Sequence, residues 1–164
     1  MELQVAVKLI EKGVSGPKGE QQWADLGAGE GLFSRALAGL LGDRSIVYAI
    51  DRDGSALQKA DLSAVAVNIW KVRLDFLKDD IGLEQLDGVL MANSLHFVED
   101  KLGFLTKLRQ RLKTSGRIIL VEYDMDTPNA WVPYPISYDS LRPLAANVGF
   151  GSVTKIGEEP SLYN

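Results

Sequence analysis

Two kinds of apolar pattern alternate along the chain and predict alternating helices and strands. Apolar residues at steps of three and four, which share one face of a helix, occur in residues 5–10, 32–41, 102–112 and 141–148. Short and nearly continuous apolar runs, typical of parallel strands covered on both faces, occur in residues 23–26, 45–50, 67–74, 88–92, 117–121 and 152–156. This alternation predicts an α/β fold, a three-layer αβα sandwich around an open, mostly parallel sheet with right-handed crossovers.

Polar residues, glycines and prolines predict where several helices begin and end. Ser55 and Gln58 fit a capping box that opens a further helix, and Gly42 stands where the glycine after a helix is expected. Pro143 is expected in the first turn of the last helix, where its missing N–H costs little. The first helix is expected to cover one face of the sheet, with a lid over a ligand as the alternative. Residues 124–137 contain three prolines and predict a long ordered loop.

The composition is that of a soluble protein of one domain. The chain has 164 residues, 46% apolar and 24% charged, and is too short for a nucleotide-binding domain with a separate substrate domain. No apolar run approaches the length of a membrane span, and the start of the chain lacks a basic segment followed by an apolar one. We therefore expect a cytoplasmic protein with residues 1–164 in a single domain.

Charge and residue types narrow the chemistry further. The chain has no cysteine and one histidine, which excludes a disulfide, a thiolate nucleophile and a metal site built from thiolates or several imidazoles. We therefore expect no metal. The net charge of −4 gives no general attraction to a phosphate backbone, so neither nucleic acid nor a membrane is an expected partner. A small molecule is the expected substrate.

The most informative segment combines a strand, a glycine turn and the start of a helix. Residues 25–31 read Asp-x-Gly-x-Gly-x-Gly, and three glycines in one tight turn allow positive φ and let a ligand lie against the backbone. The spacing differs from the G-x-G-x-x-G of dinucleotide-binding folds. The alternative is a glycine turn that only joins the strand to the helix.

Further polar residues follow the carboxyl ends of later strands, where open α/β sheets bind ligands. Asp51 stands 20 positions after Gly31, the distance at which a β-α-β unit delivers a carboxylate to a ribose diol; a helix cap or a solvated turn is the alternative. Asp75 ends the next strand, where it is placed to accept from an adenine amine with Phe76 or Leu74 against the ring. A purely structural role for Asp75 stays open.

These segments together resemble the motifs of class I S-adenosylmethionine (SAM) dependent methyltransferases. The resemblance covers nearly the whole chain, in motif I (Asp25 to Gly31), motif II (Asp51), motif III (Asp75-Phe76), motif IV (Leu86 to Asn93) and the following strand (Gly116 to Val121). It implies SAM as the cofactor, with a binding site made of Asp25, Gly27, Ala28, Gly29, Gly31, Asp51, Arg52, Asp75, Phe76 and Asn93. In this family the acid at the position of Asp25 supports the glycine loop and the amino group of SAM, and the residue at the position of Asn93 lies near the aminoacyl tail.

The chain departs from the family pattern in two places. Asn93-Ser94-Leu95 lacks the Asn/Asp-Pro-Pro-aromatic signature of enzymes that methylate amino groups of bases or glutamine. The family sheet normally ends in an antiparallel hairpin, and residues 161–164 leave little sequence for its last strand. The final antiparallel strand is therefore expected to be missing.

The resemblance implies direct, in-line methyl transfer, in which alignment supplies much of the acceleration. His96 is the candidate base, because imidazole titrates near neutral pH, with a structural or substrate-contacting role as the alternative. The expected acceptor pocket consists of Glu122, Tyr123, Trp131 and Tyr134, unless Trp131 instead packs its loop onto the domain. A SAM-binding module without activity and an NAD(P)-dependent oxidoreductase are the competing functions.

Overall fold

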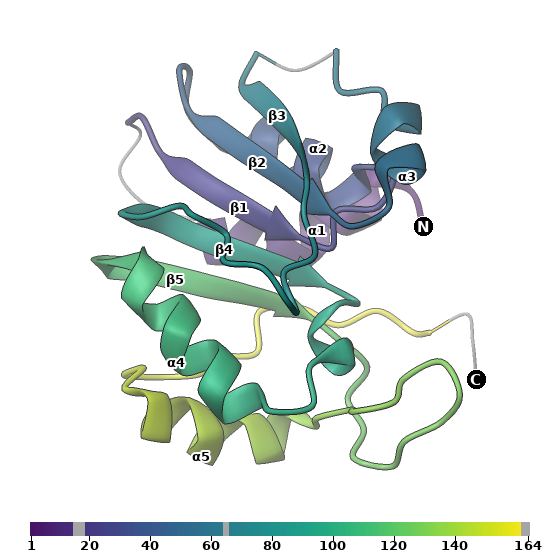
Figure 1. Ribbon diagram of the computed structural model, residues 1–164, viewed down its shortest axis with the longest axis vertical. Helices are drawn as coiled ribbons and strands as arrows, with labels where there is room; N and C mark the ends of the chain where they lie inside the picture. Colours follow the sequence, from purple (N-terminus) through teal and green to yellow (C-terminus); the bar gives the residue numbers. More distant parts are fainter. Residues whose placement is uncertain (15–18, 64–65, 162–164) are drawn as a thin grey trace.

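The computed structural model describes residues 1–14, 19–63 and 66–161, and in these the strands form one parallel sheet. The strands are β1 (Gln22–Leu26), β2 (Ile46–Asp51), β3 (Asn68–Arg73), β4 (Leu86–Ala92) and β5 (Leu112–Val121). Their order across the sheet is β3-β2-β1-β4-β5, and all five arrows point the same way (Figure 1). Strand order reverses at β1, so the carboxyl ends of β1 and β4 flank the crevice where this architecture binds ligands.

Helices cover both faces of the sheet (Figure 1). They are α1 (Leu3–Val14), α2 (Leu32–Leu40), α3 (Gly54–Lys59), the 3₁₀ turn η1 (Leu95–Phe97), α4 (Lys101–Arg111) and α5 (Tyr138–Val148). One core contains α1 and α2 residues with Trp23 and Leu90, and the other contains Leu26 and Val89 with Leu105 of α4. Because neighbouring residues of each strand enter opposite cores, the predicted three-layer sandwich is confirmed. None of the described helices combines the length and apolarity needed to cross a membrane.

The apolar face of α1 packs on the sheet, as the sequence predicts. Ala6, Ile10 and Val14 are buried in the same core as Trp23 of β1. The Trp23 ring lies over Gly88 of the adjacent strand, where a Cβ atom would stand only 2.3 Å from it. Glycine at position 88 is thus required by the size of its neighbour.

The predicted strand at residues 152–156 is wrong. Residues 151–161 follow α5 as an irregular segment, and β5 pairs with β4 alone among the described strands. Val153 and Ile156 favour extended backbone. The contacts that fix the segment nevertheless come from side chains and not from hydrogen bonds to a neighbouring strand. Ile156 packs into the core of α1 and α2, and the Tyr138 hydroxyl donates to the Val153 carbonyl at 3.2 Å.

Two predicted helix features also differ. The capping box of Ser55 and Gln58 is wrong, because the N-cap of α3 is Asp53, two residues earlier, whose side chain accepts from the Ser55 N–H at 2.9 Å. Pro143 lies in the second turn of α5, since that helix begins at Tyr138 after an N-cap. Proline has no N–H, so the helix lacks one internal hydrogen bond at this position. The sequence pattern had placed Pro143 in the first turn, where no such bond is lost.

Candidate active site

The glycine turn follows β1 and is fastened to the next strand. The backbone N–H groups of Gly27 and Ala28 donate to the Ile50 carbonyl at 2.8 and 3.0 Å. Gly27, Gly29 and Gly31 have φ of 85°, 53° and 81°, all in the left-handed region that favours glycine. All three glycines are therefore needed for the backbone of the turn.

The three glycines of the turn differ in what lies beside them. A Cβ on Gly27 would stand 2.6 Å from Cβ of Ser94, and one on Gly31 would stand 2.8 Å from Cδ2 of Leu62. Among the described residues, no heavy atom beyond the chain neighbours lies within 4 Å of the same position on Gly29. Gly27 and Gly31 thus let the turn pack against the protein, whereas Gly29 presents its backbone to open space where a ligand can lie.

Asp51 ends β2 and faces the glycine turn. Its Oδ2 accepts from the Gly29 N–H at 2.8 Å, and its Oδ1 accepts from the Asp53 N–H at 2.8 Å. A carboxylate has about four acceptor positions, so each oxygen can take another hydrogen bond. The cap of α3 is Asp53, which removes the helix-cap alternative for Asp51; Arg52 between them is exposed.

Asp25 is a buried carboxyl group directly beneath the turn. Its Oδ2 accepts from the Ser34 hydroxyl at 2.6 Å, while Oδ1 is sealed from solvent and has no hydrogen-bond partner in the described part of the chain. Burial raises the pKa of Asp25 from 3.8 to about 7, the hydrogen bond from Ser34 opposes this rise and the charge of Asp51 adds to it. Asp25 therefore supports the turn from a position that solvent does not reach.

The structure places Phe76, more than Asp75, against the turn. Phe76 Cε1 lies 3.7 Å from the position of a Cβ on Gly27, and its ring packs on Phe104 with centroids 5.8 Å apart. Asp75 closes its own turn, because its Oδ1 accepts from the Leu77 N–H at 3.1 Å. Phe76 is thus placed to cover a flat ligand group.

The end of β4 joins the glycine turn to the far side of the site. Asn93 has φ of 53°, a left-handed conformation that asparagine tolerates, and its N–H donates to the Val121 carbonyl at 2.8 Å. The Ser94 hydroxyl donates to the Leu26 carbonyl at 2.6 Å. Asn93 and Ser94 therefore lie between the carboxyl ends of β1 and β5.

His96 and Glu122, which the sequence offered for separate roles, are paired. Glu122 Oε2 lies 2.7 Å from His96 Nδ1, and Oε1 accepts from the backbone N–H groups of Ser94, Leu95 and His96 at 2.9, 2.7 and 3.3 Å. His96 is only 4% exposed. A carboxylate at the end of β5 thereby orients the imidazole that follows β4.

Lys101 is a buried cation that the sequence analysis missed. Its Nζ donates to the carbonyls of Val98 and Tyr134, at 2.7 and 2.5 Å. Burial lowers the pKa of Lys101, and the nearby charge of Glu122 opposes that shift. Lysine in a first helical turn normally reaches solvent, so no sequence signal distinguished it.

The loop of residues 122–137 holds Tyr134 beside His96 but leaves Trp131 in solvent. The Tyr134 N–H donates to the His96 carbonyl at 3.0 Å, and the Tyr134 side chain is 39% exposed. Trp131 is 82% exposed, in a turn where Asn129 Oδ1 accepts from its N–H at 2.9 Å. The buried anchor of this loop is Val132, so Trp131 does not pack the loop onto the domain.

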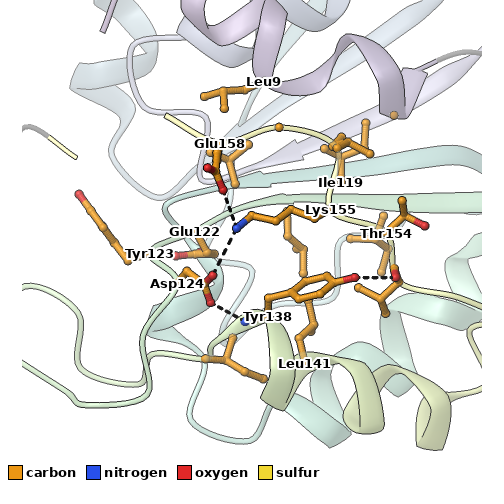
Figure 2. Close-up of a pocket in the computed structure, with 18 of the residues that line it drawn as sticks. Leu9, Ile119, Glu122, Tyr123, Asp124, Tyr138, Leu141, Thr154, Lys155 and Glu158 are labelled. Atoms are coloured by element: carbon orange, nitrogen blue, oxygen red, sulfur yellow. Dashed lines mark hydrogen bonds and ion pairs between the residues drawn. The ribbon is translucent and has the colours of Figure 1, made fainter. Parts of the chain in front are cut away.

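A hollow of about 1490 Å³ runs along the outer edge of β5, between α1, α5 and residues 151–161 (Figure 2). Of the predicted site residues it includes Asn93, Glu122 and Tyr123, but not the glycine turn, Trp131 or Tyr134. Lys155 crosses it, with Nζ 2.7 Å from Glu158 Oε2 and 3.6 Å from Asp124 Oδ2 (Figure 2). The volume of the hollow exceeds that of typical small-molecule pockets, because no described strand pairs with the outer edge of β5.

Comparisons with known proteins agree with this geometry. A family model described as "Methyltransferase domain" matches residues 24–118. A SAM-dependent methyltransferase from Leishmania major has a TM-score of 0.72 at 16% identity, over 90% of this chain and 62% of that one. No curated protein matches the sequence.

Two further solved structures share the fold. A methyltransferase of calicheamicin biosynthesis, with S-adenosylhomocysteine (SAH) bound, has a TM-score of 0.66 at 19% identity, over 90% of this chain and 47% of that one. An arsenic(III) SAM methyltransferase from Chlamydomonas reinhardtii has a TM-score of 0.68 at 21% identity, over 90% of this chain and 61% of that one. The chain thus spans less than two thirds of the length of all three of these structures.

Proposed function

The chain belongs to the methyltransferase-domain family, and from this premise we propose that it transfers a methyl group from SAM to a small-molecule acceptor. The observation that carries the proposal is the open backbone at Gly29 beside the Asp51 carboxylate. The φ of Gly29 favours glycine in any such turn, so the support for a ligand site is the open space beside that backbone together with the acceptor positions left on Asp51. In the family motif this is the position over which the cofactor lies.

The residues around the turn suit the groups of SAM. Asp51 has acceptor positions left for the two ribose hydroxyls, and Phe76 offers an aromatic face for the adenine. Asp25 is proposed to support the turn and the amino-group side of SAM from beneath, and Asn93 is proposed to stand on the aminoacyl side. Bound SAM supplies a methyl group already activated by the positive sulfur, so these residues have to bind and align it.

The acceptor is proposed to bind where the ends of β4 and β5 meet. Glu122 and Tyr123 stand at that end of the hollow, and Tyr134 is held beside His96. A net charge of −4 favours a small molecule over nucleic acid. Trp131 is proposed to close over the acceptor from its exposed position.

Trp131→Ala is expected to raise the acceptor KM or reduce turnover, because a large apolar surface is removed from the mouth of the site. The affinity for SAM should stay within experimental error. Trp70→Ala is the matched control, since Trp70 is also exposed, at 59%, but lies on β3. Equal kinetic effects of the two substitutions would contradict a role for Trp131.

Asp51→Asn is expected to weaken SAM binding by about 1.5 to 3 kcal/mol, the range for losing hydrogen bonds to a charged group. Stability should fall as well, because Asp51 also accepts from two backbone N–H groups. Asp53→Asn is the control: it removes the same charge two residues away but keeps a good helix cap. Calorimetry should show weaker SAM binding for the first variant only, and equal affinities would exclude Asp51 from the ribose site.

The function itself is tested by titrating the protein with SAM, SAH and NAD in a calorimeter and then assaying transfer from methyl-labelled SAM. Binding of SAM and SAH but not NAD, followed by transfer, is the expected result. Tighter binding of NAD would favour the oxidoreductase alternative. Binding of SAM without transfer to any acceptor would favour the module without activity.

A further inference from the structure

β5 lies at the edge of the sheet, and backbone groups of alternate residues in it face outwards. The Val121 carbonyl accepts from the Asn93 N–H, which follows β4, and successive residues of a strand direct their backbone groups to opposite sides. The N–H and C=O groups of Ile118 and Leu120 therefore point away from β4, towards the hollow. Among the described residues none pairs with them. Such an edge is able to pair with another extended segment.

The hollow continues the plane of the sheet between the two helical layers. Ile119 of β5 packs in the core of α1 and α2, whereas Leu120 packs on the opposite side, in the core that includes α4 and α5 residues. Half-buried Leu9 of α1 and Leu141 of α5 line the hollow on its two sides (Figure 2). The hollow thus offers what a further strand needs, which is backbone partners along one edge and apolar surface on both faces.

A lipid chain or another apolar small molecule fits this edge less well than a peptide does. It would cover the outward N–H and C=O groups of Ile118 and Leu120 without bonding to them, and each buried group left unbonded costs about 1 to 3 kcal/mol. An extended polypeptide presents both a donor and an acceptor at every second residue. It can therefore cover the apolar walls and bond to the strand edge at the same time.

Acidic side chains outnumber basic ones around the hollow. Its lining includes five carboxylates and two cations, namely Glu2, Glu122, Asp124, Glu158 and Glu159 against Arg117 and Lys155. Lys155 is shared between two of the carboxylates, at 2.7 Å from Glu158 and 3.6 Å from Asp124 (Figure 2). An excess of negative charge therefore remains at the end of the hollow beyond β5, where it attracts a cationic side chain of an occupant.

The same features disfavour a second copy of this chain as the occupant. The edge of β5 is bordered by α1, α5 and residues 151–161, so the edges of two copies would be kept from the spacing of about 4.8 Å that strand pairing requires. The irregular segment of residues 151–161 could reach further, but it carries Glu158 and Glu159 against Lys155. It would bring like charge to an acidic groove.

We propose that the outer edge of β5 binds an extended segment of a different protein. The segment joins the sheet as a further strand, bonds to the backbone of Ile118 and Leu120, and places a lysine or arginine beside Asp124 and Glu158. Backbone hydrogen bonds supply affinity in this mode of binding, and the apolar walls and the acidic end supply specificity. The proposal is independent of methyl transfer, because the glycine turn does not line the hollow.

The open edge is tested first, by amide hydrogen exchange of the protein alone followed by NMR. The N–H groups of Ile119 and Val121 point to β4 and serve as the internal reference. We expect those of Ile118 and Leu120 to exchange at least about tenfold faster. Sedimentation should show a monomer. Equal protection at all four positions, or a dimer in which Ile118 and Leu120 become protected, would overturn the proposal.

The occupant is tested with a display library of random peptides of about ten residues, selected on the whole chain. Selected sequences are expected to be rich in β-branched residues and to carry a lysine or arginine, and a synthetic copy should slow the exchange of Ile118 and Leu120. N-methylation of the alternate peptide residues that face β5 should raise the Kd at least about tenfold. N-methylation of the intervening residues is the matched control and should have little effect.

The charge preference is tested with Glu158→Gln, whose side chain is 79% exposed, so the fold should not change. This variant should bind the selected peptide about two- to fivefold more weakly at low salt, while the exposed control Glu99→Gln, away from the hollow, binds it as the wild type does. Binders without a cation, equal effects of the two variants, unchanged exchange of Ile118 and Leu120 on binding, or a library without binders would each overturn the proposal. The methyl transfer proposed above would stand in every case.

Discussion

Gly29→Val is expected to lower SAM affinity by at least about 100-fold, while the protein still folds. The glycine faces open space, since no heavy atom of the described residues beyond its chain neighbours lies within 4 Å of its Cβ position, and a side chain there occupies the volume proposed for the ligand. Its φ of 53° adds strain of about 1 to 2 kcal/mol to any residue with a Cβ, and more to valine because it is β-branched. Calorimetry with SAM measures the binding, and urea denaturation of the ligand-free protein measures the stability.

Two other glycines provide the controls. Gly27→Ala should cost about 3 kcal/mol of stability, since its Cβ would stand 2.6 Å from the Cβ of Ser94 at a φ of 85°. Gly39→Ala, in the last turn of α2, should change neither property for the worse, because no other side chain of the described residues lies within 4 Å of its Cβ position. Wild-type SAM affinity in Gly29→Val would show that the cofactor does not lie on this turn.

Asp25→Asn is expected to remove a pH dependence of stability of about 4 kcal/mol. The pKa of Asp25 is about 7 in the folded protein against 3.8 for the free group, so between these values the folded state binds more protons than the unfolded state. The stability linked to this carboxyl group is therefore fully present below about pH 4 and is lost as pH rises through about 7. Urea denaturation from pH 4 to 8 should show the variant gaining on the wild type over this range.

SAM binding should show the opposite trend with pH. The positive charges of SAM above the turn favour the ionised carboxyl beneath it, so SAM should bind more tightly as pH rises towards 7, by up to about tenfold per pH unit. In Asp25→Asn this dependence should disappear. Parallel pH curves for the wild type and the variant would show that Asp25 does not titrate in this range.

The sequence by itself determined the architecture and the position of the glycine turn beside Asp51. Residues three and four positions apart share one face of a helix whatever surrounds them, so the apolar steps predicted α1, α2, α4 and α5, while the continuous apolar runs predicted all five strands of the described sheet. The Asp-x-Gly-x-Gly-x-Gly spacing of residues 25–31 predicted a turn with positive φ, because that requirement is local to the backbone. Asp51 could be predicted for the same reason, since one β-α-β unit fixes its distance from the turn.

Only the tertiary structure decided which of the three glycines faces open space and which side chains meet. His96 and Glu122 are 26 residues apart, and neither has a pattern that predicts a partner; the parallel pairing of β4 and β5 brings them together. The buried cation Lys101 depends in the same way on the carbonyl of Tyr134 from a distant loop. Residues 152–156 failed as a strand because a strand needs a partner's backbone, which extended propensity alone does not supply. Local rules decide each segment's own conformation, whereas contacts between distant segments decide the charge and orientation of the groups that perform chemistry.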